Sequence, residues 1–598
     1  MRVGVDSGGT FTDFAAWDGS RLQSLKVRST PHDPAQAILK GLSRFGADEV
    51  IHGSTVATNA LHQAGGARTA FVTTRGFEDL LALARQNRAA LYDWCPVPKR
   101  ALIHDSDKHG IPERTLHDGS ILQALADRDL ATLAAELGAV ESVAVCLLHS
   151  YANPAHEQQV GRALRDAGYS VSLSSEILPE YREYERAATT VVNAYLSPLM
   201  RRYIRSLERR LPSTRLRVFQ SNGGSISAAE ACEQAVRTML SGPAAGLVGA
   251  AAVARQLGIE RFISFDMGGT STDVSLHDGA PRITTERDAA GLPVRIPMLD
   301  IESIGAGGGS VAYYDAGSAL RVGPRSAGAD PGPVCYGTGE ELTVTDANLL
   351  LGRIDSGSFL EGTIRLDAHR ARHYAARAAR EAGVGVEQFA AAVVRAANSK
   401  MERAIRAVSV QRGHNPRDYA MICFGGAGAL HACELAESLG IPRVVVPAHA
   451  GVLSALGMLV ADCVRDYSAS LLDKDAGAVF DRLARTAASD MRRQGFPEFD
   501  LVRTLDMRYE GQSYEINVPE SRRREFNEIH EKRYGYRHPD RAFEAVTARV
   551  RAVGRIAREE GPDLDAAAVG PRFASVYVPN GWRASNKAGS NLILRRAG

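Results

Sequence analysis

The chain has 598 residues, which is too long for one hydrophobic core and predicts two to four domains. Hydrophobic residues make up 44% of it and charged residues 23%, a balance typical of globular proteins in water. The formal net charge of +2 gives no general attraction to nucleic acids or anionic membranes, so we expect neither as a partner.

The cysteines and the apolar segments indicate the cellular compartment to expect and whether the chain crosses a membrane. None of the seven cysteines forms a CxxC pair, which argues against a zinc knuckle or a dithiol site and favours a reducing cytoplasm. The start, MRVGVDSGGT, carries no charged-then-apolar signal segment. The most membrane-like stretch, residues 444–460, is interrupted by Pro447 and Gly451. We therefore expect a buried strand, a loop and a helix there rather than a membrane span.

An internal repeat is the most informative feature of the sequence. Residues 6–19 read DSGGTFTDFAAWDG and residues 266–279 read DMGGTSTDVSLHDG, and a short apolar run precedes each. Both follow D-x-G-G-T-x-T-D, four residues and Asp-Gly. The pattern predicts a strand, a tight Gly-Gly turn, a second strand and an Asp-Gly turn. A recurrence of eight positions within fourteen residues is hard to attribute to a chance structural hairpin.

The repeat divides the chain into three expected domains. Residues 1–185 hold the first hairpin and alternating strand and helix patterns, which indicate an α/β sheet covered by helices. Residues 186–475 begin with a long helical stretch and carry the second hairpin and several glycine-rich loops. Residues 485–598 show further strand patterns and are predicted to form a smaller domain.

The hairpins have the chemistry of a polyphosphate site. Glycines without a Cβ let phosphate oxygens approach backbone amides, and neighbouring threonine hydroxyls can donate hydrogen bonds. Asp6 and Asp266 end their strands at the loop mouth and are expected to hold Mg²⁺, through water. The phosphate-binding candidates are Asp6, Gly8, Gly9, Thr10 and Thr12 on one side, and Asp266, Gly268, Gly269, Thr270 and Thr272 on the other.

Two further features belong to the same predicted site. Asp13 and Asp273 are candidate catalytic residues that position water or a reacting group, although each could equally cap its hairpin. The string ICFGGAGALHA, residues 422–432, predicts a strand that runs through a glycine turn into a helix. Such turns are common packing devices, but here one falls where an adenosine site is expected. A P-loop is excluded, because no GxxxxGK[ST] string occurs.

The order of hairpin, hairpin and strand–glycine–helix resembles the actin, sugar kinase and Hsp70 ATPase superfamily. The resemblance implies an α/β fold of two ribonuclease-H-like domains around a nucleotide cleft, here with a small C-terminal α+β domain. Longer strings, among them HGSTVATNAL, SGPAAGLVGAA, IGAGGGSVAYYD and TVTDANLLLGRI, are similar to the A-type subunit of the hydantoinase/oxoprolinase family. The similarity runs from Met1 to about Tyr467.

The resemblance to that family implies ATP and Mg²⁺ as cofactors, a small-molecule substrate and a B-type partner subunit. It implies opening of a cyclic amide, such as a hydantoin or 5-oxoproline, through a phosphorylated amide oxygen. An ATP-dependent ketone carboxylase, a non-catalytic ATP-binding module and a simple kinase remain alternatives, and homo-oligomerisation stays open.

The resemblance also assigns roles to individual residues. Gly425, Gly426 and Gly428 would flank the adenosine. Gly307, Gly308, Gly309 and Ser310 would line the cleft near the γ-phosphate or the substrate, unless their loop is only structural. Thr345, Asp346 and Asn348 would brace this loop. His431 would reach the cleft as a catalytic residue, although a histidine at a helix start is more often structural.

One departure from the family pattern concerns the C-terminal region. Residues 550–570 run almost directly into a tail, residues 573–596, that resembles the usual ending of the family. We expect the segment that normally lies between them to be missing. This leaves the partner interface and full activity open, while the nucleotide motifs are unaffected.

Overall fold

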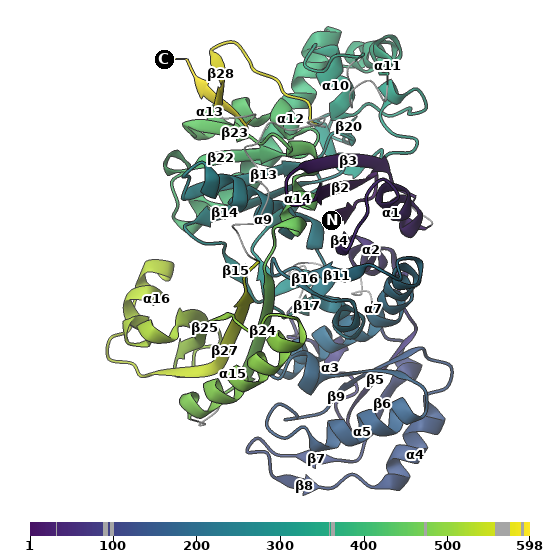
Figure 1. The fold of residues 1–598 in the computed structure, drawn as a ribbon, viewed down its shortest axis with the longest axis vertical. Coiled ribbons are helices and arrows are strands. Elements are labelled where there is room, and N and C mark those ends of the chain that lie inside the picture. The colour runs from purple at the N-terminus through teal and green to yellow at the C-terminus, as the bar shows by residue number, and fades with distance from the viewer. Residues whose placement is uncertain are drawn as a thin grey trace.

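The computed structural model describes the chain except residues 31–32, 88–91, 93, 96–100, 358, 360–364, 472–474, 557–573, 588–590 and 598. Most of the junction at which the sequence predicts a shortened C-terminal region thus lies outside the described residues. Two lobes are stacked along the long axis, and a smaller unit lies against the side of the lower half (Figure 1).

The first lobe is built on a six-stranded sheet of order β12-β11-β4-β1-β2-β3. Strand β1 runs antiparallel to β2 and parallel to β4, and β4 is parallel to β11. The sheet begins with the predicted hairpin. Its strands are β1 Arg2–Ser7, β2 Phe11–Trp17, β3 Leu22–Arg28, β4 Glu49–Ser54, β11 Arg215–Phe219 and β12 Ser225–Ser227.

The second lobe repeats this arrangement in a seven-stranded sheet of order β19-β14-β13-β22-β23-β29-β28. In both sheets the first strand lies between the second and the fourth, and the second strand alone among the first five is reversed. This confirms the predicted α/β fold with two ribonuclease-H-like sheets. The strands are β13 Arg261–Met267, β14 Thr272–Asp278, β19 Glu302–Ile304, β22 Ala420–Phe424, β23 Arg443–Val446, β28 Trp582–Lys587 and β29 Asn591–Arg596.

Two helices, α9 (Ser241–Gln256) and α14 (Leu453–Leu459), pack closely against each other and against the first sheet. A Cβ at Gly457 would lie 1.9 Å from the carbonyl oxygen of Ala245. A Cβ at Gly4 would lie 2.0 Å from the carbonyl oxygen of Ala455. These glycines let backbones touch where the two lobes join. Other helices that cover the sheets are α1 Pro34–Leu42, α2 Val56–Gln63, α7 Glu183–Arg210, α10 Val344–Leu350, α11 Ala368–Glu381, α12 Val386–Val408 and α13 Ala432–Leu439.

Two four-stranded sheets lie outside the sheets of the two lobes. One has the order β10-β9-β5-β6, with β5 Thr69–Thr74, β6 Lys108–Ile111, β9 Ser142–Cys146 and β10 Ser170–Leu173, and it packs with helices α4 Asp127–Glu136 and α5 Ala155–Asp166. The other has the order β24-β27-β25-β26 and forms a C-terminal α+β unit, which begins at Cys463, before the expected boundary at residue 485. Its elements are β24 Cys463–Ser470, α15 Ala476–Arg493, β25 Asp500–Tyr509, β26 Ile516–Pro519, α16 Phe526–Tyr534 and β27 Phe543–Gly554.

The sheets cross the domain boundaries expected from the sequence. Strands β11 and β12 lie beyond residue 185, yet they complete the sheet of the first lobe. Strands β28 and β29 lie within residues 485–598, yet they extend the sheet of the second lobe. Strand pairing between distant segments, which a linear division of the chain does not capture, causes both differences.

The apolar stretch at residues 444–460 contains β23 and α14, in agreement with the prediction of a buried strand, loop and helix. Within the part of the chain that the structure describes, no helix combines the length and apolar character needed to span a bilayer.

Candidate nucleotide site

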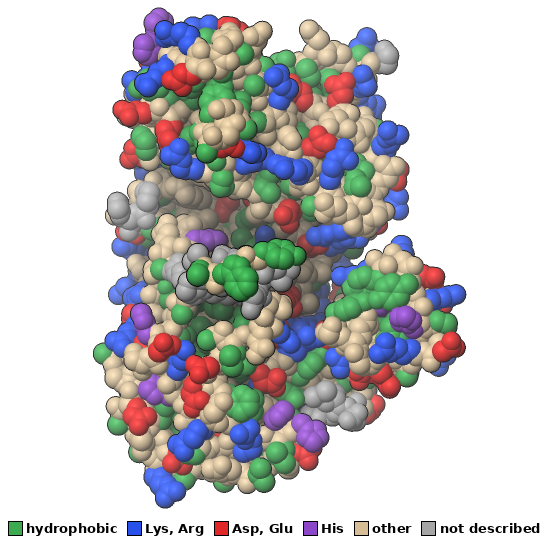
Figure 2. All heavy atoms as spheres, turned by 180° about the vertical axis from the view of Figure 1, so that it is seen from behind, with side chains coloured by type: hydrophobic (Ala, Val, Ile, Leu, Met, Phe, Trp, Pro, Cys, Tyr) green, Lys and Arg blue, Asp and Glu red, His purple; other side chains and the backbone are tan. Residues whose placement is uncertain are grey.

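Four aspartates from the two hairpins converge between the lobes. Asp6 lies opposite Asp13 in the β1–β2 register, and Asp266 lies opposite Asp273 in the β13–β14 register. The charges of Asp273, Asp6 and Asp13 all raise the pKa of Asp266, so the acid pairs of the two lobes lie within electrostatic reach of each other. The surface is hollowed below the upper lobe, with acidic side chains visible inside the hollow (Figure 2).

Asp6 and Asp266 are the two aspartates of this group whose charge is not offset by a bonded partner among the described residues. Burial, with a smaller contribution from Asp13, raises the pKa of Asp6 to about 7, and Lys26 opposes this. Burial also raises the pKa of Asp266 well above its ordinary value. Neither carboxylate hydrogen-bonds or pairs with another residue that the structure describes. Two shielded acids without a cation fit a divalent ion.

The surroundings of Asp6 and Asp266 suit a Mg²⁺ ion that is bound to a polyphosphate, rather than a metal ion held entirely by protein ligands. Among the described residues, no group of three or more His, Cys, Asp or Glu side chains could hold a metal. Mg²⁺ usually keeps several waters and takes one or two carboxylates together with substrate phosphates. Asp6 and Asp266 are therefore suited to hold it as the sequence predicts, through water and from opposite lobes.

The two remaining aspartates have different partners. The Nζ atom of Lys26 lies 2.5 Å from Oδ1 of Asp13, across the β2–β3 pair. At the equivalent register position, Ser303 on β19 donates a hydrogen bond to Asp273. Burial raises the pKa of both acids, to about 6 for Asp273, against the opposing effect of each partner. Among the described residues, Asp13 thus has a direct ion pair with a cation, whereas the bonded partner of Asp273 is a hydroxyl.

The Gly-Gly turns offer exposed backbone to a ligand. The amide of Gly8 donates to the carbonyl of Phe11 at 3.0 Å, and that of Gly268 donates to Ser271 at 3.1 Å, so these two amides close the turns. Gly9 and Gly269 are exposed, and a Cβ on either would meet no atom within 4 Å. A phosphate can therefore approach the backbone closely at Gly9 and Gly269, beside Thr10 and Thr270.

Thr12 and Thr272 do not present their hydroxyls to the space between the lobes, which corrects the expectation that they contact phosphate. Both are fully buried. The Thr12 hydroxyl lies 3.0 Å from that of Ser29, which in turn donates to the carbonyl of Gly8 at 2.7 Å. The Thr272 hydroxyl donates to the carbonyl of Ala306. Both threonines brace the turns from behind.

The glycine loop at residues 307–309 is likewise buried and supports the second turn. The amide of Gly308 donates to Gly268 at 3.0 Å, and a Cβ at Gly307 would lie 2.6 Å from the amide nitrogen of Thr270. Gly307 and Gly308 thus form the packing behind the turn instead of lining the cleft. Thr345 donates to the carbonyl of Gly308 through its amide at 2.7 Å and its hydroxyl at 2.9 Å, the predicted bracing contact.

The third glycine motif lies beside Asp266. Gly425 has a φ of +80°, and a Cβ there would lie 2.4 Å from Oδ1 of Asp266, so both conformation and space require glycine. Gly426 is exposed next to it. Gly428 is buried, and a Cβ there would lie 2.9 Å from the sulfur of Cys423. Gly425 and Gly426 remain candidates for nucleotide contact, whereas Gly428 serves packing.

His431 is fully buried, which corrects the expectation that it reaches the cleft. Its Nδ1 lies 2.7 Å from Oδ1 of Asn398, and its Nε2 lies 3.3 Å from Nδ2 of Asn348. Burial lowers its pKa to about 3, so the ring is neutral at physiological pH. Its position favours a structural role.

Comparisons with known proteins show the family of the chain. The sequence profile described as Hydantoinase/oxoprolinase matches residues 186–467, and that of the Hydantoinase/oxoprolinase N-terminal region matches residues 2–168. The caprolactamase subunit alpha of Pseudomonas jessenii is 36% identical over 97% of this chain and 90% of its own. The chain belongs to the hydantoinase/oxoprolinase family.

Two solved structures share the complete architecture. The crystal structure of ATP-dependent caprolactamase from Pseudomonas jessenii superposes with a TM-score of 0.88 at 32% identity and covers the whole of both chains. The nucleotide-free structure of acetone carboxylase superposes with a TM-score of 0.78 at 24% identity over all of this chain and 99% of that one. At that identity the second match is a likeness of fold alone.

Proposed function

We propose that this hydantoinase/oxoprolinase chain is the ATP-binding subunit of an ATP-dependent cyclic amide hydrolase. The observation that carries the proposal is the pair of facing acid hairpins, which offers two shielded carboxylates and two open glycine turns to a single triphosphate. The resemblance to an ATP-dependent caprolactamase over the full chain supports a cyclic amide as the substrate.

The chemistry of an amide explains why ATP is needed. Resonance makes the carbonyl carbon a poor electrophile, and bound ATP would supply a phosphoryl group to the amide oxygen, which opens that carbon to attack by water. The ring then opens when the C–N bond breaks and the ring nitrogen leaves with a proton, and the phosphate is released by hydrolysis. In this chain Asp6 and Asp266 would hold Mg²⁺, and the turns at Gly9 and Gly269 would receive phosphate oxygens. Lys26, held at Asp13, would stabilise negative charge that develops during transfer.

A B-type subunit is proposed as the partner. The caprolactamase relative is itself named a subunit alpha, and its likeness extends over almost the whole of this chain. We also propose a cytoplasmic location, which the scattered cysteines of the sequence, without a CxxC pair, support.

The test is ATP turnover by the chain purified with its native partner. We expect a cyclic amide such as caprolactam, 5-oxoproline or hydantoin to stimulate ADP release without bicarbonate, with one ring opened per ADP. Turnover that requires a ketone together with bicarbonate would instead identify a carboxylase. If the chain binds nucleotide but no substrate stimulates turnover, the chain is a non-catalytic ATP-binding module and the proposal is overturned.

A further inference from the structure

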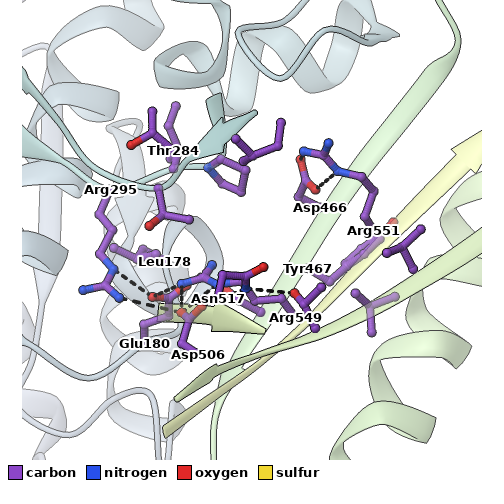
Figure 3. Close-up of a pocket in the computed structure, with 18 of the residues that line it drawn as sticks. Leu178, Glu180, Thr284, Arg295, Asp466, Tyr467, Asp506, Asn517, Arg549 and Arg551 are labelled. Carbon is purple, nitrogen blue, oxygen red and sulfur yellow. Dashed lines mark hydrogen bonds and ion pairs between the residues drawn. The ribbon is translucent and has the colours of Figure 1, made fainter. Parts of the chain in front are cut away.

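A large cavity lies apart from the phosphate hairpins. It has a volume of about 1280 Å³ and is enclosed by the first lobe, the segment between β14 and β19, and the C-terminal α+β unit. No residue of the two glycine turns lines it. Figure 3 shows charged side chains on several of its walls, including Glu180, Arg295, Asp466 and Arg549.

Most of the shielded charges in this cavity already have partners. Glu180 is fully buried and pairs with Arg295 at 3.1 Å and with Arg549 at 2.8 Å. Asp466 accepts two hydrogen bonds from Arg551, at 2.7 and 3.1 Å, and a third from Asn222 at 2.8 Å. The contacts of Glu180 with Arg549 and of Asn222 with Asp466 join the C-terminal unit to the rest of the molecule, and neither acid is left in need of another cation.

Arg237 differs from these arginines. It lines the cavity and is mostly shielded from solvent, but its side chain forms no hydrogen bond or ion pair with any residue that the structure describes. The acids whose charges act on it are Asp466 and Glu180, both engaged elsewhere. Burial lowers the pKa of Arg237, which reflects the cost of a shielded cation without a bonded anion.

The backbone of Arg237 is held firmly. Its carbonyl accepts hydrogen bonds from the amide of Ser221 at 2.9 Å and from the hydroxyl of the same residue at 3.1 Å. The neighbouring Val236 is fully buried, and its amide donates to Oδ1 of Asn193 at 3.1 Å. The backbone of Arg237 is fixed, and its guanidinium has no partner among the described residues. A ligand could therefore bind there with little further cost in conformational entropy.

We propose that this cavity is a second ligand site, in which Arg237 binds the carboxylate of a small organic acid. A planar guanidinium matches a carboxylate through two parallel hydrogen bonds. Acidic and cationic side chains line the cavity in nearly equal number, which favours a monoanion over a multiply charged phosphate. Leu178, Ile226 and Ile296 supply apolar wall for the carbon chain of the acid.

The experiment is calorimetric titration of the nucleotide-free chain with hexanoate, benzoate and 6-aminohexanoate, with inorganic phosphate as a separate arm. We expect at least one carboxylate to bind with one site per chain. Arg237→Gln should weaken that binding at least about tenfold, and Arg237→Lys should weaken it less. Arg482→Gln is the matched control, because Arg482 lines the same cavity but is exposed, and binding should be unchanged.

The outcomes separate this site from the proposed reaction. Preference for 6-aminohexanoate over hexanoate would identify a ring-opened amide as the ligand, and equal binding would identify a general organic-acid site. Arg237→Gln should retain its melting temperature and its MgATP affinity, since its side chain has no described partner. The proposal is overturned if none of the carboxylates binds the wild-type chain, if Arg237→Gln binds them unchanged, or if phosphate binds more tightly through Arg237.

Discussion

At the scale of single residues, the two acid pairs differ in the side chain that contacts their second aspartate. Lys26 reaches Asp13, whereas the equivalent position in the second lobe supplies only the hydroxyl of Ser303. A triphosphate adds further negative charge, so the position of the cation distinguishes the two lobes. We infer that the first hairpin faces the phosphate that is transferred.

Replacing Lys26 with methionine should therefore lower substrate-dependent ATP turnover by about 100-fold, the scale of removing one charge-stabilising donor from an active site. Lys26→Arg should restore part of the activity. The effect is measured as steady-state ATP turnover of the chain in complex with its partner subunit. The matched control is Ser303→Ala, at the equivalent position beside the other hairpin. Equal losses from Lys26→Met and Ser303→Ala would contradict the assignment.

The raised pKa of Asp6 predicts a second result, for the ligand-free protein. Between the unfolded pKa of 3.8 and the folded pKa of about 7, the folded state binds more protons than the unfolded state, so rising pH destabilises the fold. Asp6→Asn removes this cost. We expect its melting temperature to exceed that of the wild type by a few degrees at pH 8, and the gain to shrink as the pH falls towards 4.

The control lies in the same hairpin. Asp18 is exposed, and hydrogen bonds from the backbone of Ser20 and Arg21 lower its pKa. Asp18→Asn should therefore give no stabilisation at pH 8. Thermal melts of the three proteins across this pH range measure the effect, and an Asp6→Asn variant that melts below the wild type at pH 8 would refute it.

At the scale of elements, the hairpins were predictable because they are local. Each fourteen-residue repeat contains the end of the first strand, the second strand and both turns, and an apolar run precedes it, so the local sequence indicates the form of the hairpin. Thr12 and Thr272 were misassigned, although alternation along a strand places each on the face opposite its neighbouring aspartate. Lys26, Ser303 and the buried environment of His431 depend on pairing or packing with segments that sequence proximity does not reveal.

The two kinds of glycine around the second turn should respond differently to substitution. Gly307→Ala places a Cβ 2.6 Å from the turn backbone and should lower the melting temperature. Gly269→Ala meets no protein atom within 4 Å, so it should leave that temperature nearly unchanged while weakening MgATP binding. Melting curves with and without MgATP separate the two effects. Comparable loss of stability in both variants would show that Gly269 is not kept open for a ligand.

At the scale of the whole molecule, distant segments complete both lobes. Strand β29 pairs with β23 along Arg443–Val446, and β28 pairs with β29 at the edge of the second sheet. The backbone of Ser575 donates to the carbonyl of Gly426 at 3.1 Å, so the region before β28 also reaches the third glycine motif. The last residues of the chain thus contribute to the lobe that carries Asp266.

This arrangement predicts that Leu594 matters for the second lobe although it lies close to the end of the sequence. Leu594 is fully buried, and Leu594→Ala should lower the free energy of unfolding by about 2–5 kcal/mol. The adjacent Arg595 is exposed, and Arg595→Ala should change it by less than about 0.5 kcal/mol. Denaturant unfolding of both variants checks the contrast, which would be absent if β29 were not part of the folded lobe.

The central claim is that hairpins from two lobes hold one nucleotide together. Calorimetric titration of the chain with MgATP tests it most directly. We predict one ATP bound per chain, dependent on Mg²⁺, and at least about tenfold weaker binding when either Asp6→Asn or Asp266→Asn alters one lobe alone. Two nucleotides per chain, or full affinity in either variant, would contradict the account.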